Sequence, residues 1–286
     1  MFVIIPAYLR DEAAAARLEC TLAHFHAATA VRCVLVTQGR SFSAPVDLRA
    51  RLIHRHFDNP LGKWPAVRAG LAAAAATADA PAMLLDGDDP VTSGSMRAAI
   101  AALQGGSFDL CIGERDQIRL IADDQTSPYS RSIVEAYTNA LVLRPQAAGA
   151  ALGHGGPDIQ SGLYLLSARA VRLLDLTYVA DYGGELSLYH ELAARDLAIT
   201  TLPVETNSAT PSSYSIRKIV ASVSALPFMA SIGKDSLRDA IPVAHALYRR
   251  YLGDVTLEQF GSEIRRFFAA FLATPASHPD GRQPAK

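Results

Sequence analysis

Short apolar runs alternate with alanine-rich segments over the first 90 residues of the chain. Runs rich in β-branched residues or leucine predict strands at residues 2–5, 31–37, 51–55 and 82–85. Alanine-rich segments at residues 12–28 and 65–78 predict helices, the first with Leu18, Leu22 and Phe25 at helical spacing. Because strands and helices alternate in this order, we predict an α/β fold with a parallel sheet covered by helices.

The remaining chain continues this alternation less regularly and then becomes helical in pattern. We predict strands at 108–113, 158–167 and 198–204, and helices at 95–103, 131–143, 168–174 and 185–195. The pattern from 216 to 272 is helical, with breaks at proline and glycine. We therefore expect an α/β domain over 1–215, a helical extension over 216–274 and a disordered tail over 275–286. The extension is expected to pack on the domain or in a homodimer.

Composition and charge narrow the class of protein. Half of the 286 residues are hydrophobic, and the net charge is −1 with an isoelectric point near 6.7. Such a balance argues against a nucleic-acid partner bound through a broad basic surface. Cys20, Cys33 and Cys111 lie far apart in apolar segments, which is typical of reduced thiols rather than a disulfide or zinc framework. With no signal peptide and no apolar run of about 18 residues, we expect a cytoplasmic protein without a transmembrane segment.

An acidic cluster follows the fourth predicted strand: Asp86, Gly87, Asp88 and Asp89. Open α/β sheets bind their ligands at the carboxyl ends of the strands. Two carboxylates two residues apart can share a hard divalent cation whose other ligands are phosphate oxygens and water. We therefore predict that Asp86 and Asp88 bind Mg²⁺ or Mn²⁺. The alternative is a solvated acidic turn.

Basic and backbone groups are expected at the same edge of the sheet. Lys63 and Arg68 supply positive charge, and Lys63 begins a helix whose dipole also favours anions. Pro6, Ala7 and Tyr8 follow the first strand and offer backbone groups and an aromatic face. Alternatively, Lys63 is a solvated lysine and Tyr8 a rim aromatic. Together these residues predict a nucleotide-diphosphate site.

Three motifs in order resemble the nucleotide-sugar-dependent glycosyltransferases of GT-A fold, especially the family-2-like group. They are Val3–Tyr8, Gly62-Lys63 opening a helix with Arg68, Gly70 and Leu71, and Leu84–Asp89. The resemblance implies a Rossmann-like, mostly parallel sheet flanked by helices, with a C-terminal helical extension. It also implies that Asp86 contacts the ribose and the surroundings of the metal, and that Asp88 ligates the ion. The donor would be bound by Pro6, Ala7, Tyr8, Lys63, Asp86 and Gly87.

The second half is similar to the glucosyl-3-phosphoglycerate and mannosylglycerate synthases, which retain anomeric configuration. The similar segments are Ser130–Glu135 with Leu143-Arg144-Pro145, and Tyr182–Leu188. This resemblance implies that Arg131 meets an anionic group of the acceptor, and that Glu185 hydrogen-bonds the sugar or acts in transfer. Asp158, at the start of a predicted strand, is a further candidate for positioning the acceptor. A surface arginine and an ordinary helix-start acid are the alternatives for Arg131 and Glu185.

The sequence departs from that group in two places. The second strand ends in Thr37-Gln38 without the usual acidic residue, and residues 205–215 contain no histidine for a third metal ligand. These departures leave the nucleobase and the complete set of metal ligands open.

The predicted activity is metal-dependent transfer of a sugar from a UDP- or GDP-sugar to a hydroxyl of a small, possibly anionic, or lipid-linked acceptor. Glu185 would be the general base if configuration inverts, and would only position groups if it is retained. A nucleotidyltransferase is one alternative, although no glycine-rich basic loop follows the first strand. A non-catalytic nucleotide-sugar-binding protein is the other.

Overall fold

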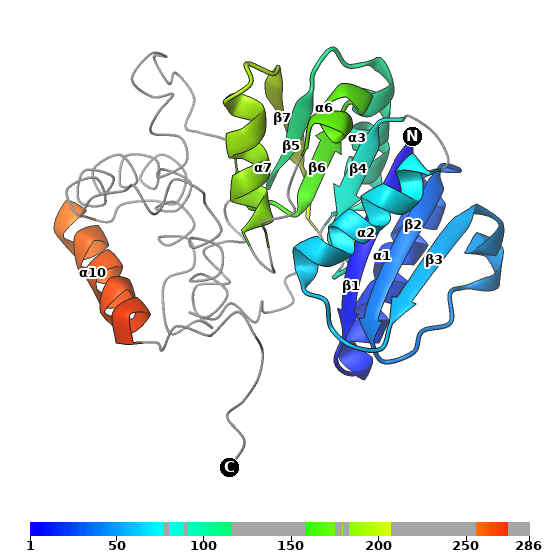
Figure 1. The fold of residues 1–286 in the computed structure, drawn as a ribbon, viewed down its shortest axis with the longest axis horizontal. Helices are drawn as coiled ribbons and strands as arrows, with labels where there is room; N and C mark the ends of the chain where they lie inside the picture. Colours follow the sequence, from blue (N-terminus) through cyan, green and yellow to red (C-terminus); the bar gives the residue numbers. More distant parts are fainter. Residues whose placement is uncertain are drawn as a thin grey trace.

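The computed structural model describes residues 1–76, 80–88, 91–115, 158–174, 179, 183–206 and 256–273, with side chains described up to 266. Within these residues the centre of the fold is a seven-stranded sheet in the order β3-β2-β1-β4-β6-β5-β7 (Figure 1). The strands are β1 (Phe2–Leu9), β2 (Arg32–Gly39), β3 (Leu52–Phe57), β4 (Ala82–Leu85), β5 (Leu110–Arg115), β6 (Leu163–Leu166) and β7 (Ile199–Val204). Neighbouring strands run parallel, except that β6 is antiparallel to both β4 and β5. The predicted α/β class with a mostly parallel sheet is confirmed.

Helices cover both faces of this sheet. They are α1 (Glu12–Ala28), the short 3₁₀ helix η1 (Val46–Arg51), α2 (Lys63–Ala75), α3 (Ser93–Gly105), α6 (Ala168–Leu173) and α7 (Gly184–Ala193). Helix α10 (Leu257–Ala273) lies apart from this sheet in Figure 1. Leu18 of α1 and Met96 of α3 pack on one face, beside Val3 and Ile5 of β1. Helices α2, α6 and α7 contribute to the core on the other face. Because β1 is buried on both faces, it has the near-continuous apolar sequence typical of a central parallel strand.

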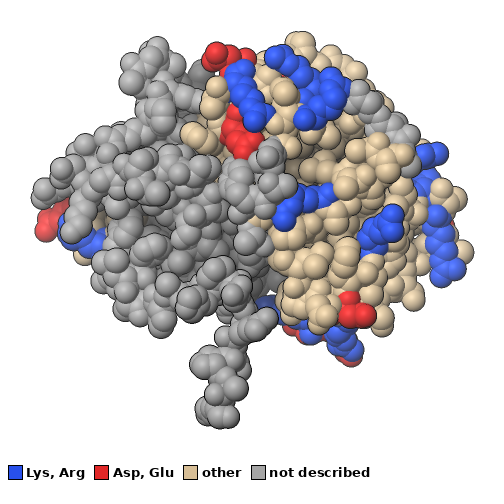
Figure 2. Space-filling model, in the orientation of Figure 1, with Lys and Arg blue, Asp and Glu red and all other residues tan. Residues whose placement is uncertain are grey.

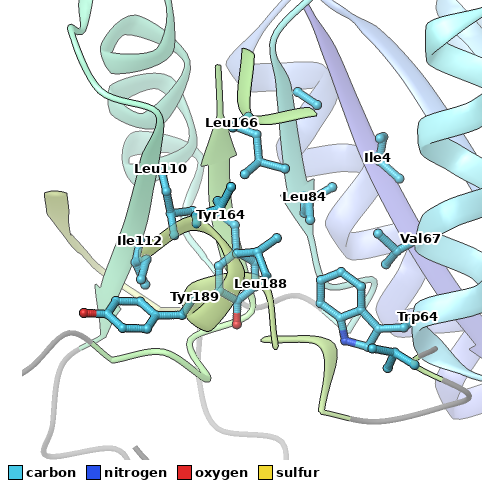
Figure 3. Packing of buried hydrophobic residues seen from close by; sticks show 14 of the residues in the cluster. Ile4, Trp64, Val67, Leu84, Leu110, Ile112, Tyr164, Leu166, Leu188 and Tyr189 are labelled. Atoms are coloured by element: carbon cyan, nitrogen blue, oxygen red, sulfur yellow. The ribbon is translucent and has the colours of Figure 1, made fainter. Parts of the chain in front are cut away.

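The core under α2 and α7 brings together side chains from widely separated parts of the chain. Ile4 of β1, Leu84 of β4 and Tyr164 of β6 belong to the same buried cluster as Trp64 of α2 and Leu188 of α7 (Figure 3). Helices α2 and α7 therefore pack on the face of the sheet to which Ile4 and Leu84 contribute. The acidic cluster after β4 begins two residues beyond Leu84. This layer is the support on which the candidate site is built.

The predicted elements within the described residues are confirmed, with differences at their ends. Strand β1 continues through Pro6 to Leu9, whereas the sequence predicted a strand over residues 2–5 only, before the proline. Pro6 lies beyond Ile4, the last β1 residue paired with β4, and proline is tolerated where a strand lacks one neighbour. Strand β6 begins at Leu163 rather than at Asp158. A turn precedes it, in which the Ser161 amide donates to the Asp158 carbonyl at 3.1 Å.

The predicted helical extension is described only in part. Helix α10 lies within it, while the boundary at 215, the predicted helix at 131–143 and the tail at 275–286 fall outside the described residues. Among the helices that the structure does describe, none is long and apolar enough to cross a membrane.

Candidate functional site

The candidate site lies where the carboxyl ends of β1 and β4 meet the first residues of α2 and α7. The β4–β6 ladder brings Leu85 opposite Leu163, so the start of the antiparallel β6 also lies at this edge. Asp86 follows Leu85 directly, and its amide donates a 3.0 Å hydrogen bond to the Gly162 carbonyl. The acidic cluster is therefore held between a parallel strand and the antiparallel strand inserted beside it.

A lysine and two carboxylates from three different elements form an ion cluster here, which we call the Lys63 cluster: Lys63, Asp86 and Glu185. Lys63 Nζ lies 2.9 Å from Asp86 Oδ1, 3.0 Å from Asp86 Oδ2 and 2.5 Å from Glu185 Oε1. The side chains of Lys63, Asp86 and Glu185 are 21%, 29% and 11% exposed. The sequence predicted each residue for the site, and the structure brings all three together.

Trp64, which the sequence did not predict for the site, holds the other oxygen of Glu185. Its buried indole Nε1 donates a 2.9 Å hydrogen bond to Glu185 Oε2. The indole also packs on Gly184, where an added Cβ would lie 1.9 Å from Trp64 Cδ2. Adjacent residues at the start of α2 thus bind both oxygens of one carboxylate at the start of α7. The available sequence signal was that the chain's single tryptophan directly follows Lys63.

Burial and mutual repulsion make Asp86 unusual. Burial, together with the nearby charges of Asp88 and Glu185, raises the pKa of Asp86 to about 6, and the attraction of Lys63 offsets only part of this. For Glu185 burial also acts upward, but the ion pair and hydrogen bonds with Lys63 and Trp64 outweigh it and lower its pKa. Burial likewise opposes the charge on Lys63, yet Asp86 and Glu185 hold the lysine pKa well above its usual value.

The turn after β4 packs directly against the end of β1. A Cβ on Gly87 would lie 2.9 Å from both the Pro6 carbonyl oxygen and Ala7 Cβ, so only glycine fits at this approach. On the other side, Gly162 has φ +82°, and a Cβ there would lie 2.8 Å from Asp86 Oδ2. Three of the residues predicted to bind the donor, Pro6, Ala7 and Gly87, are therefore in contact.

The aromatic side chain of Tyr8 is accessible at this edge of the sheet, and its contact with the donor stays a prediction. It is 53% exposed, and its ring lies against Gly39 at the end of β2. Elsewhere on the described part of the face drawn in Figure 2, basic side chains form several separate groups. Positive charge is therefore not concentrated in one broad surface in this view.

The residues present fit part of the coordination sphere of a divalent cation. Asp88 is exposed beside Asp86, but both oxygens of Asp86 contact Lys63. Within the described ranges, no group of three or more histidine, cysteine, aspartate or glutamate residues is placed to hold a metal ion. Mg²⁺ commonly takes only one or two protein carboxylates and completes its shell with substrate phosphates and water. The chemistry of Asp86 and Asp88 suits that mode, and their metal binding stays a prediction.

Asp158 is buried and pairs with Arg115, the last residue of β5. Arg115 Nε lies 2.6 Å from Asp158 Oδ2, and Nη2 lies 2.8 Å from Oδ1, so the guanidinium binds both oxygens. Sequence reasoning missed this partner, and the acceptor role of Asp158 stays a prediction. Arg68 donates from Nη1 to the Val179 carbonyl at 2.6 Å. Arg131 lies outside the described residues.

Comparisons with known proteins identify the fold. No protein-family model matches the chain, and no curated protein matches it. One similar solved structure is the mannosyltransferase PcManGT from Pyrobaculum calidifontis in complex with GDP-Man and Mn²⁺. It has a TM-score of 0.51 and 14% identity, over 96% of this chain and 80% of that chain. Another is glucosyl-3-phosphoglycerate synthase from Mycobacterium tuberculosis in complex with phosphoglyceric acid, with a TM-score of 0.49 and 16% identity, over 89% and 81% of the two chains. The chain therefore shares the fold of a GT-A-type glycosyltransferase, as its sequence predicted.

Proposed function

We propose that the protein is a metal-dependent glycosyltransferase that moves a sugar from a UDP- or GDP-sugar to an acceptor hydroxyl. The observation that carries this proposal is the Lys63 cluster, in which charges from α2, from the turn after β4 and from α7 meet at the carboxyl edge of the sheet. Removing charged groups from water costs free energy, and partly buried ionisable groups with shifted pKa values are typical of functional sites. Open α/β sheets bind ligands at this edge.

The donor would bind across the ends of β1 and β4. Tyr8 offers its exposed ring to the nucleoside, while the contact between Pro6, Ala7 and Gly87 shapes the backbone wall. Lys63, as a fixed cation, would bind the diphosphate. Asp88, with Asp86, would hold Mg²⁺ or Mn²⁺, which when bound neutralises the charge that develops on the leaving diphosphate.

Glu185 is better suited to positioning Lys63 than to removing a proton from the acceptor. One of its oxygens contacts the Lys63 ammonium and the other accepts from the Trp64 indole, and these partners keep its pKa low. A general base works best with a pKa near the working pH and with an oxygen within reach of the proton. The geometry therefore supports the second of the two predicted roles, which goes with retention of configuration.

Arg131 and Asp158 are proposed to face a small anionic or lipid-linked acceptor, with Asp158 acting while paired to Arg115. A homodimer through residues 216–274 and a cytoplasmic location stay predictions. A nucleotidyltransferase and a non-catalytic nucleotide-sugar-binding protein are the competing functions.

Nucleotide binding with and without metal separates these functions. Thermal unfolding is measured with UDP- and GDP-sugars and with nucleoside triphosphates, each with and without Mn²⁺ or Mg²⁺, and product analysis follows for any ligand that stabilises. Metal-dependent stabilisation by one nucleotide sugar, followed by its turnover, supports the proposal. A preference for nucleoside triphosphates supports the nucleotidyltransferase, and binding without turnover supports the binding protein.

A matched pair of variants tests the metal assignment. Asp88→Asn should abolish the metal-dependent part of nucleotide-sugar binding without lowering the free energy of unfolding, because Asp88 is exposed and its charge repels that of Asp86. Glu19→Gln removes another exposed acid, in the middle of α1, and should change neither quantity. Full metal-dependent turnover by Asp88→Asn would show that this carboxylate does not hold the ion.

A further inference from the structure

Gln38, near the end of β2, uses its side-chain amide to hold the two residues that precede Lys63. Its Oε1 accepts from the Leu61 amide at 2.5 Å and from the Gly62 amide at 3.0 Å, and its Nε2 donates to the Gly62 carbonyl at 3.2 Å. Gln38 is only 2% exposed. A carboxamide oxygen has two lone pairs, and both are used here by one short stretch of backbone.

These hydrogen bonds act where helix α2 begins without a conventional cap. Gly62 precedes the helix with φ 97° and ψ 166°, and it has no side chain with which to bind the free amides of the first turn. Its carbonyl accepts both from Gln38 and from the Ala66 amide at 3.3 Å, which is the first hydrogen bond of the helix. Gln38 therefore fixes, from the neighbouring strand, the peptide from which α2 starts.

Lys63 is the next residue, and its ammonium must reach Asp86 and Glu185 together. Because Nζ lies 2.9 Å from one carboxylate and 2.5 Å from the other, a small change in the direction of the helix start would break one of these contacts. We propose that Gln38 is a positioning residue for the donor site: by fixing Leu61 and Gly62, its amide places Lys63 between Asp86 and Glu185. The catalytic consequence rests on the function proposed above, whereas the positioning itself does not.

The neighbouring residue Thr37 provides a matched control. Successive residues of a strand point to opposite faces, so Thr37 lies away from α2. Its buried Oγ1 lies 2.8 Å from His54 Nε2 and 2.9 Å from His56 Nδ1 on β3. Thr37→Val thus removes buried hydrogen bonds of the same strand without touching the start of α2, and Gln38→Met removes those to Leu61 and Gly62 at similar side-chain length.

Chemical labelling of the Lys63 amine tests whether its contacts with Asp86 and Glu185 are intact, because these contacts limit its reactivity. The metal-free protein is treated with an acetylating reagent, and peptide mass spectrometry compares Lys63 with Lys218, Lys234 and Lys286, the other lysines of the chain. Gln38→Met removes three hydrogen bonds and should raise the relative labelling of Lys63 by about three- to tenfold, which corresponds to the net contribution of about one of them. Thr37→Val should leave it unchanged. Equal labelling in the two variants would overturn the proposal and assign Gln38 to general stability.

A conservative variant and a kinetic measurement complete the test. Gln38→Glu keeps an acceptor for the Leu61 and Gly62 amides but loses the donor to the Gly62 carbonyl, so its labelling should lie between wild type and Gln38→Met. If Gln38→Met does not fold, the test uses Gln38→Glu instead. The proposal is then overturned if Lys63 is labelled no more in Gln38→Glu than in Thr37→Val. Where turnover is measured, Gln38→Met should raise the KM for the donor and leave that for the acceptor unchanged. If no nucleotide sugar binds to the wild type, the proposed function fails while labelling still decides the role of Gln38.

Discussion

The indole of Trp64 donates a 2.9 Å hydrogen bond to Glu185, a residue 121 positions later in the chain. Lys63, the residue before Trp64, binds the other oxygen of the same carboxylate. A charged group and its neighbouring neutral donor therefore fix both the position and the rotation of Glu185. The first residues of α2 and α7 are therefore linked through Glu185. A substitution at the start of either helix should alter the contacts of the whole Lys63 cluster.

Replacing Trp64 with phenylalanine should destabilise the protein by removing one hydrogen bond and part of a buried ring. Phenylalanine leaves Glu185 Oε2 without this donor, so we expect a loss of about 1.5–3 kcal/mol from the hydrogen bond, to which the lost packing adds. Urea denaturation followed by circular dichroism measures the free energy of unfolding. In a double-mutant cycle with Glu185→Leu, which removes both acceptor oxygens, a coupling energy near zero would contradict the importance of this bond.

Adding one methyl group at Gly184 should disturb the packing of Trp64 against the start of α7 by steric clash. Because the new Cβ would lie 1.9 Å from Trp64 Cδ2, we expect Gly184→Ala to cost about 1–3 kcal/mol, as overpacking of a core typically does. Gly105 at the end of α3 is the control, since an added Cβ there meets no atom within 4 Å. Gly105→Ala should be neutral or slightly stabilising. Equal stability of the two variants would mean that α7 tolerates a shift away from α2.

Asp86 should make the metal-free protein less stable at neutral pH than an uncharged residue would. Its pKa is raised from 3.8 to about 6, so the folded state binds more protons than the unfolded state between these values, and stability falls as pH rises through this window. Two pKa units correspond to about 3 kcal/mol. Asp86→Asn should therefore be more stable than wild type at pH 8 by up to this amount, with the difference vanishing near pH 4.

Denaturation of both proteins across pH 4 to 8, with a chelator present, tests this prediction about Asp86. Glu19→Gln serves as the control for removal of an exposed charge. Saturating Mn²⁺ and nucleotide should selectively stabilise the wild type, because a bound cation favours the ionised carboxylate. A stability difference between Asp86→Asn and wild type that stays constant with pH would contradict the raised pKa of Asp86.

The sequence was sufficient to predict the elements but not the pairs that cross the fold. Local apolar patterns predicted β1 to β4 with their helices, and the abrupt change from Leu85 to Asp86 marked the ligand edge. Hydrophobic periodicity does not state which strands are neighbours, so the antiparallel insertion of β6 between β4 and β5 was not predicted. The Trp64–Glu185 pair depends on that arrangement, because α7 follows β6 in the chain. Trp64 and Glu185 are distant in sequence, and only the three-dimensional packing brings them together.

The buried pair of Arg115 and Asp158 should behave as a structural unit whose halves depend on each other. Arg115→Met leaves the buried Asp158 carboxylate without its bidentate partner, and we expect a loss of about 3–5 kcal/mol. Adding Asp158→Asn to Arg115→Met removes the uncompensated charge of the Asp158 carboxylate and should recover part of this loss. Denaturation of the two single variants and the double variant measures the free energy of unfolding of each. If Asp158 also meets the acceptor, the double variant should keep a raised acceptor KM after its stability has recovered. Recovery of both quantities together would leave Asp158 a structural partner of Arg115 and remove it from the acceptor site.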